Sequence, residues 1–496
     1  MPEVKDSQSE ICIKPVEMTS NNIYNVISCV VDFFNMDKET ACAQIEKYII
    51  SRLRFFETNN VNKTVFFVSE NEYVETEWKD MVSMHYINTT YKFKNTVMRF
   101  HLFSDEQACQ ESYLGFFTLR SVDEIRIMLS MIYPNWTNIR MENLLYVMTY
   151  KKVVHFFGKI FIMNTYPLFV QDMVVAKCAH AAILSATKYL NEKHRLKKVK
   201  LTDIINSYTY SRVKVFPATG LSCQQMLEVF DRNNIPITCD ELSWDSDYES
   251  TDELNILENL KEKFRPTIDS WIESAIPVIL GISFKKNKTD PDYVHHVVQI
   301  IGHTSGKSRD YVIYDDSGVL GEILLGHRDF VFILSWKQIQ EVMKYGDYVI
   351  YPQYEKVYMG YDDIKKYLCD YQSELNTNED FKTKFLKLGQ LPSFERARCL
   401  IADNVDIKNF LYRQKEKTKL LKEYVNNTID AIISRNLPHY LWYCEIELSD
   451  QMLLVFLANP TYNTQTTKNI FINKEHLIFN ENMGLLTRIN TENMCV

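Results

Sequence analysis

The sequence predicts an α+β protein built from more than one domain. Its 496 residues exceed what a single hydrophobic core holds. Hydrophobic residues make up 46% and charged residues 24%, which is the balance of a folded globular protein. Segments with the period of a helix and segments with the period of a strand both recur along the chain. We divide it into three predicted regions: 1–165, 166–355 and 356–496.

The first region, 1–165, is predicted to be an α+β domain without a chemical motif. Thr19-Ser20 and Asp37 are candidate caps of two helices, the first with an apolar face over 23–31. The pattern then changes to a period of two, which predicts strands over 64–68 and 91–103. A further helix is predicted over 122–132.

The middle region, 166–355, is predicted to have a helical half followed by a β half. The acidic stretch 240–253 separates the halves and is typical of an exposed loop. Strands are predicted at 278–282, 297–301 and 311–314. The third region, 356–496, is predicted to be mixed, with helices and strands at 362–375, 409–435, 440–448 and 452–457.

Charge and targeting signals exclude several classes of protein. The formal net charge is −8, and the most basic run, 194–200, is interpreted as a solvated helix end, so no nucleic-acid partner is expected. The N-terminus lacks an apolar signal segment, and no stretch reaches about 18 apolar residues, so neither secretion nor a membrane span is expected. The eleven cysteines include no C-x-x-C pair, which favours free thiols in a cytoplasmic protein and no metal or cofactor.

Cys178 is the candidate nucleophile. It directly precedes an apolar stripe of helical spacing that starts at Ala179. In the first turn of a helix, unpaired backbone N–H groups and the positive end of the dipole stabilise a thiolate. Cys223 is the rival thiol, because Ser222 and Gln225 form a capping box that places it in a first turn as well. Cys223 lacks the helix of small residues that follows Cys178.

His296 is the candidate base and Asp316 the candidate carboxylate. His295-His296 precedes an apolar strand, and because strand side chains alternate between faces, only one of the two can serve. The strand 311–314 ends in Asp315-Asp316, where a carboxylate could orient the imidazole. Both aspartates stay open, with Asp316 favoured. Gln171, seven residues before Cys178, could donate to a developing oxyanion together with the Cys178 N–H.

These residues together resemble the papain-like cysteine peptidases, and most of all the double-glycine (bacteriocin-processing) peptidase-like branch. The resemblance covers about 170–330 and rests on four segments: 171–182, 274–281, 296–302 and 311–316. It implies a papain-like two-lobed core, helical in one half and antiparallel β in the other, flanked by additional α+β regions. The family's oxyanion glutamine stands six residues before the cysteine, where this chain has Asp172, and the residue after the cysteine is Ala179.

The resemblance implies a cysteine peptidase that acts on a peptide or isopeptide bond of a protein or peptide substrate. A thiol acyltransferase on the same fold and a catalytically inactive interaction protein are the alternatives. A third hypothesis is a metalloenzyme using His295, His296, His303 and an aspartate, although their spacing fits no tetrahedral site pattern.

Overall fold

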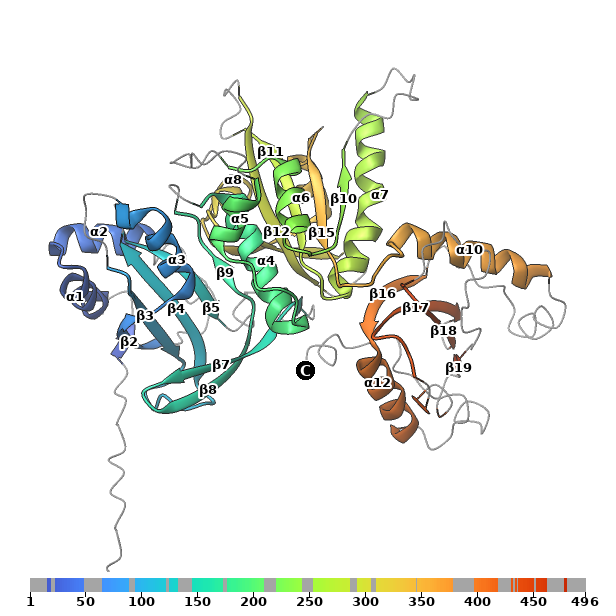
Figure 1. The fold of residues 1–496 in the computed structure, drawn as a ribbon, viewed down its shortest axis with the longest axis horizontal. Helices are drawn as coiled ribbons and strands as arrows, with labels where there is room; N and C mark the ends of the chain where they lie inside the picture. The colour runs from blue at the N-terminus through green and yellow to red at the C-terminus, as the bar shows by residue number, and fades with distance from the viewer. Residues whose placement is uncertain are drawn as a thin grey trace, which may run out of the picture. The chain divides into compact units, whose positions relative to one another are not determined.

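The computed structural model describes residues 16–18, 23–48, 65–88, 94–121, 125–132, 145–172, 176–208, 220–242, 253–285, 292–304, 309–344, 346–377, 397–417, 430, 433–434, 436–449, 452–461 and 477–479. Its helices and antiparallel sheets confirm the α+β class (Figure 1). The chain packs as two compact units: 1–234 with 279–342, and 235–278 with 343–496. The three predicted domains remain a prediction, because both units join segments that are distant in sequence.

The first sheet of unit 1 is antiparallel and is drawn mostly in blue in Figure 1. Its strand order is β1 (Val16–Met18), β2 (Val65–Tyr73), β3 (Val97–Phe103), β4 (Tyr113–Ser121), β5 (Ile125–Ile132) and β9 (Leu168–Phe169). The helices of this part are α1 (Ile23–Phe34), α2 (Lys38–Tyr48), α3 (Thr76–Met84) and the 3-10 turn Tyr86–Asn88. The predicted cap of α2 is confirmed, since Asp37 Oδ1 accepts the Thr40 N–H at 2.8 Å. The candidate cap Thr19-Ser20 lies outside the described residues.

The helix predicted over 122–132 is wrong, because residues 125–132 form strand β5. All but one of its residues are buried, so the segment carries no alternating pattern that would mark a strand. Ladder pairing with β4 on one side and β9 on the other decides its conformation. Tertiary pairing has overridden the local helical preference of Met128, Leu129 and Met131.

Unit 1 also contains strands of a second antiparallel sheet. Strands β11 (Val278–Phe284), β12 (Val294–Thr304), β13 (Asp310–Tyr314) and β14 (Val331–Ser335) follow one another in it, and β6 (Leu145–Val147) also pairs with β12. The predicted strands at 278–282, 297–301 and 311–314 are therefore confirmed. At Gly302 a Cβ would overlap the Tyr146 carbonyl, so the absence of a side chain permits β6 to approach.

Helix α4 (Cys178–His194) packs on β12 and β9 (Figure 1). Buried polar side chains fix it there. Gln299 of β12 donates from Nε2 to the Ala182 carbonyl at 2.5 Å and accepts the Tyr166 hydroxyl at 3.0 Å. Ser185 Oγ accepts the Phe169 N–H at 3.1 Å. Because buried polar groups are costly to leave unpaired, these bonds fix the position of α4 on the sheet.

The remaining elements of unit 1 surround these two sheets. They are the hairpin β7 (Tyr150–Phe156) and β8 (Lys159–Thr165), and the helices α5 (Leu201–Tyr208), α6 (Cys223–Arg232), α8 (Val319–Leu325) and α9 (Trp336–Val342). The capping box predicted before α6 is confirmed, since Ser222 Oγ accepts the Gln225 N–H at 3.2 Å and Gln225 Oε1 accepts the Ser222 N–H at 2.9 Å.

Unit 2 combines a strand pair, long helices and a four-stranded sheet. The elements are β10 (Ile237–Glu241) paired with β15 (Tyr348–Pro352), α7 (Glu253–Glu273), α10 (Tyr361–Thr377), α12 (Asn404–Lys417), and the sheet β16 (Arg398–Asp403), β17 (Tyr440–Ser449), β18 (Met452–Ala458) and β19 (Leu477–Phe479). The predicted helix at 362–375 and the predicted strands at 440–448 and 452–457 are confirmed. Of the predicted helix 409–435, residues up to 417 are helical, and 418–429 lie outside the described residues, as do 243–252 of the acidic stretch.

No helix in the described ranges is both long and apolar enough to cross a membrane.

A buried acid pair lies between α3 and α4. Glu75 and Glu77 are 4% and 2% exposed, and the Lys188 ammonium lies 3.4 Å from Glu77 and 3.9 Å from Glu75. Burial and the hydrogen bond with Glu77 raise the pKa of Glu75 to about 8. Burial opposes ionisation of Glu77 too, but its hydrogen bond with Glu75 and the Lys188 charge hold the pKa of Glu77 near about 2.

Replacing Glu75 by Gln should therefore flatten the pH dependence of stability. A carboxyl whose pKa is raised from 4.5 to about 8 by folding stabilises at low pH, and that stability is lost as the pH rises between the two values. The loss amounts to a few kcal/mol, because one pKa unit corresponds to about 1.4 kcal/mol. Gln stays neutral and still donates. Between pH 5 and pH 9 the melting temperature should fall less for Glu75→Gln than for the wild type. An equal fall in both proteins would contradict the raised pKa of Glu75.

Candidate active site

Cys178 is the first residue of α4, as the sequence predicts. The chain enters the helix through Lys177 in an extended conformation, with φ −112° and ψ 179°. The Lys177 N–H donates to His180 Nδ1 at 3.3 Å, so a histidine at the third helical position satisfies the first backbone donor. Burial lowers the pKa of His180 to about 4, which keeps its imidazole neutral and able to accept. The helix start that carries Cys178 is therefore fixed locally.

Asp172 accepts hydrogen bonds from two residues and so holds the chain that precedes α4. Its Oδ1 accepts the Ala176 N–H at 2.7 Å, and its Oδ2 accepts the Tyr86 hydroxyl at 3.0 Å. Both oxygens are acceptors, so Asp172 holds the segment but is not built as a donor to an oxyanion. The Gln171 N–H donates to Asp316 Oδ2 at 3.3 Å, which brings Gln171 next to the carboxylates. The donor role predicted for the Gln171 side chain remains a prediction.

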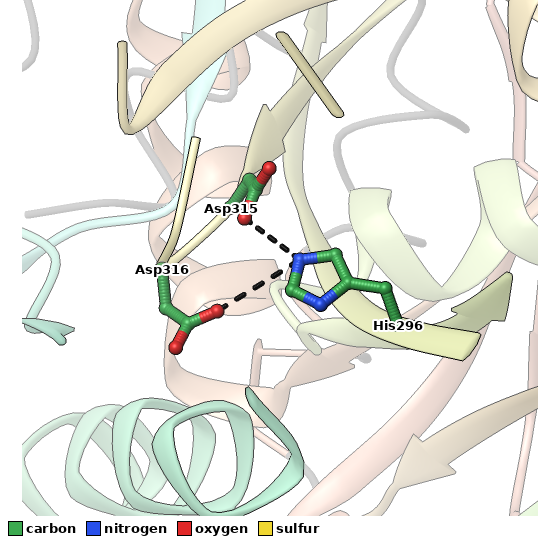
Figure 2. A group of neighbouring side chains, drawn as sticks. All are labelled: His296, Asp315 and Asp316. Carbon is green, nitrogen blue, oxygen red and sulfur yellow. Dashed lines mark hydrogen bonds and ion pairs between the residues drawn. The ribbon is translucent and has the colours of Figure 1, made fainter. Parts of the chain in front are cut away.

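His296 and His295 lie near the start of β12 and face opposite sides of the sheet, as strand alternation predicts. His295 is exposed, and its Nδ1 lies 2.8 Å from Ser283 Oγ. His296 is 7% exposed, and the Phe284 ring packs against it edge-on, with centroids 6.2 Å apart. Figure 2 shows that both carboxylates approach the same ring nitrogen of His296, Nε2.

The carboxylate that bonds the imidazole is Asp315, which corrects the preference for Asp316. His296 Nε2 lies 2.8 Å from Asp315 Oδ1 but 3.9 Å from Asp316 Oδ1 (Figure 2). The turn after β13 explains the difference. Asp315 is fully buried and also accepts the Ser317 N–H at 2.9 Å, the Ser317 hydroxyl at 2.9 Å and the Leu320 N–H at 2.8 Å. Four donors thus fix Asp315 in one orientation, with the imidazole as one of them.

The electrostatics of the pair favour the charged forms of both groups. Burial alone would raise the pKa of Asp315, but the His296 charge, its hydrogen bond and the backbone donors of Ser317 and Leu320 lower the pKa to about 2. Burial likewise opposes the imidazolium, yet Asp315 and then Cys178, each by charge and hydrogen bonding, raise the pKa of His296 well above its usual value. Cys178 is thus among the groups that raise the pKa of His296, whereas the rival thiol Cys223 begins a separate helix, α6.

The same cluster could in principle hold a cation. One ligand atom each from His296, Asp315 and Asp316 lies within 4.8 Å of the others, and all three residues are buried. However, three of the four hydrogen bonds that Asp315 accepts fall on Oδ1, the oxygen that contacts His296, so a cation between these two atoms would have to displace donors. The histidines of the third hypothesis, a metal site built from His295, His296, His303 and an aspartate, do not converge. His295 faces the other side of the sheet, and His303 lies seven residues along the same strand, about 23 Å away.

Sequence reasoning missed Ser317, His180 and Tyr86. Ser317 Oγ lies 3.3 Å from His296 Nε2 and completes the turn around Asp315. An Asp whose side chain accepts the N–H two residues on is an Asx turn, so the sequence Asp315-Asp316-Ser317-Gly318 carried a usable signal for that contact. His180 stands where a capping box has Glu or Gln. Tyr86 has no sequence signal, because only folding brings it to Asp172.

Comparison with known proteins adds no relative: the sequence matches no protein-family model and no curated protein.

Proposed function

We propose that the protein is a thiol-dependent hydrolase with a papain-like two-lobed core, and that it is a cysteine peptidase acting on a protein or peptide substrate. One observation carries the proposal. A buried imidazole, His296, is bonded to the Asp315 carboxylate, and Cys178, the thiol at the first residue of α4, contributes to the raised pKa of His296. In this proposal the nucleophile, the base and the orienting group come from α4, β12 and the turn after β13, the three roles that thiol acyl transfer needs.

The proposed reaction begins with proton transfer from Cys178 to His296. His296 Nε2 donates to Asp315, which leaves Nδ1 as the nitrogen that exchanges a proton with the thiol. The Cys178 thiolate attacks the carbonyl carbon, and the imidazolium then returns the proton to the leaving amine as the carbon–nitrogen bond breaks. A thioester on Cys178 remains. A water molecule, deprotonated by His296, releases the acid and restores the thiol.

The fate of the thioester separates two members of the class. Water as the acceptor defines a peptidase, and an amine defines an acyltransferase on the same fold. Gln171 is proposed as an oxyanion donor because its backbone lies beside Asp316, at the edge of the site. A cytoplasmic location remains an expectation that rests on the free thiols.

Selective alkylation of Cys178 tests the proposal. At neutral pH, neutral iodoacetamide should modify Cys178 at least tenfold faster than the other ten cysteines, because the imidazolium stabilises the thiolate. Peptide mass spectrometry after short exposure gives the rates residue by residue. Cys178→Ser should abolish the fast phase, whereas Cys223→Ser, at the start of α6, should leave it unchanged. Uniform modification of all thiols would contradict the proposal, and the catalytically inactive interaction protein would be the remaining hypothesis.

A further inference from the structure

Asp316 has contacts that the proposed reaction does not use. It is 3% exposed and follows Asp315 at the end of β13. Its Oδ1 lies 3.9 Å from His296 Nε2, within ion-pair distance, and its Oδ2 accepts the Gln171 N–H at 3.3 Å. A buried carboxylate is costly unless other groups compensate its charge, and these two contacts contribute to that compensation.

We propose that Asp316 is a positioning residue with two roles. Its negative charge stabilises the His296 imidazolium together with Asp315. Its Oδ2 accepts the Gln171 N–H and so holds the backbone of Gln171, seven residues before Cys178, in place. This inference rests on the proposed function. It assigns the second carboxylate a separate task from the first. Asp315 orients the ring through a hydrogen bond, whereas Asp316 lies too far for one and acts through charge and through Gln171.

The geometry explains why a second carboxylate helps rather than harms. Asp316 approaches the ring at Nε2, the nitrogen that Asp315 also contacts (Figure 2). In the proposed reaction the thiolate exchanges its proton at the other nitrogen, Nδ1, so the imidazolium is the nearer of the two charges to Asp316. Since Coulomb energy falls with distance, the imidazolium gains more than the thiolate loses, and the ion pair is favoured.

Within the part of the chain that the structure describes, the titratable groups around His296 come from two places. Asp315 and Asp316 face it from the turn after β13 and Cys178 from α4, while β11 contributes the uncharged Phe284 ring. Asp315 and Cys178 raise the pKa of His296. Burial raises the pKa of Tyr314 well above 10, and the charge of Asp316 raises it further. Removing the charge of Asp316 should thus be measurable as a change in the titration midpoint of His296.

The charge is tested by an NMR titration of His296 in the full chain with ¹⁵N-labelled histidine. Cys178→Ser serves as the parent, so that no thiol titrates with the ring. Asp316→Asn should lower the midpoint of His296 by about one pH unit, the size expected for an opposite charge near 4 Å. Asp315→Asn should lower it further. Asp310→Asn, at the other end of β13, is the matched control and should leave it unchanged.

The fastening of Gln171 is tested by alkylation of Cys178 in the chain that keeps its thiol. Asp316→Asn retains an oxygen that accepts the Gln171 N–H, whereas Asp316→Ala removes it. Losing this bond should make iodoacetamide modification of Cys178 about fivefold slower in Asp316→Ala than in Asp316→Asn, the factor expected of one hydrogen bond.

The two proposals fail differently. If Cys178 reacts selectively but Asp316→Asn leaves the His296 midpoint at the parent value, the role of Asp316 is overturned and the proposed function stands. If Cys178 never reacts selectively, the proposed function is overturned regardless of how Asp316 behaves. Equal alkylation rates for Asp316→Ala and Asp316→Asn would remove the fastening role.

Discussion

Replacing His296 by Gln should slow acyl transfer to Cys178 by a factor of roughly 10² to 10⁴, the range that a positioned general base contributes. Gln cannot take a proton from the thiol, so the nucleophile is present as a thiolate only in the fraction that ionises unaided. A simple activated ester, p-nitrophenyl acetate, measures this through release of nitrophenolate and needs no knowledge of the natural substrate. Peptide mapping should place the acetyl group on Cys178 in the wild type.

The neighbouring histidine provides a matched control. His295→Gln changes the same residue type one position away, but His295 is exposed on the other side of β12 and contacts Ser283. We expect its acylation rate to stay within about twofold of the wild type. Far-UV circular dichroism should be unchanged for both variants. Equal losses from the two substitutions would mean that the strand, and not the imidazole of His296, is responsible, and the triad would be rejected.

Arg398→Met should destabilise unit 2 by about 3 kcal/mol, at the lower end of what breaking a buried ion pair costs. Arg398 Nε donates to Glu273 Oε2 at 2.5 Å and Nη1 donates to Glu445 Oε2 at 3.0 Å. The two glutamates are 2% and 7% exposed. Burial raises the pKa of Glu445, and the Arg398 charge is what opposes that rise. Without the guanidinium, two buried carboxylates lose the positive charge that both of them contact.

Urea unfolding followed by tryptophan fluorescence measures this loss, because Trp271 and Trp442 are fully buried in unit 2, with ring centroids 5.8 Å apart. The loss should shrink at pH 5, where the carboxyls can take up protons. A triple variant with Arg398→Met, Glu273→Leu and Glu445→Leu should recover most of the stability, since apolar replacement of a whole buried ion cluster is often neutral. If the single variant is as stable as the wild type, the network has no net role.

Much of the candidate site was accessible from the sequence because its parts depend on local patterns. The apolar stripe after Cys178 predicted α4, and the apolar runs after His296 and before Asp315 predicted β12 and β13. Alternation in a strand restricted the base to one of His295 and His296. These inferences hold because helical and strand periods place side chains on faces without reference to the rest of the fold.

Two predictions failed where distant contacts outweigh local pattern. Residues 125–132 form a strand because β4 and β9 pair with them, although no period of two marks the segment. Asp315 rather than Asp316 bonds the imidazole because the Ser317 and Leu320 N–H groups fix it toward β12. The sequence pattern, a strand followed by a turn, does not distinguish Asp315 from Asp316.

By itself, then, the sequence determined an α+β chain with a thiol at the first turn of a helix and an imidazole and two carboxylates at strand ends. Only the tertiary structure decided that His296 meets Asp315 at 2.8 Å, that Asp316 reaches Gln171, and that Tyr86 holds Asp172. The physical reason is range. Periodicity and capping act over a few residues, whereas these contacts join positions 19, 145 and 86 residues apart and form only when sheets and helices pack.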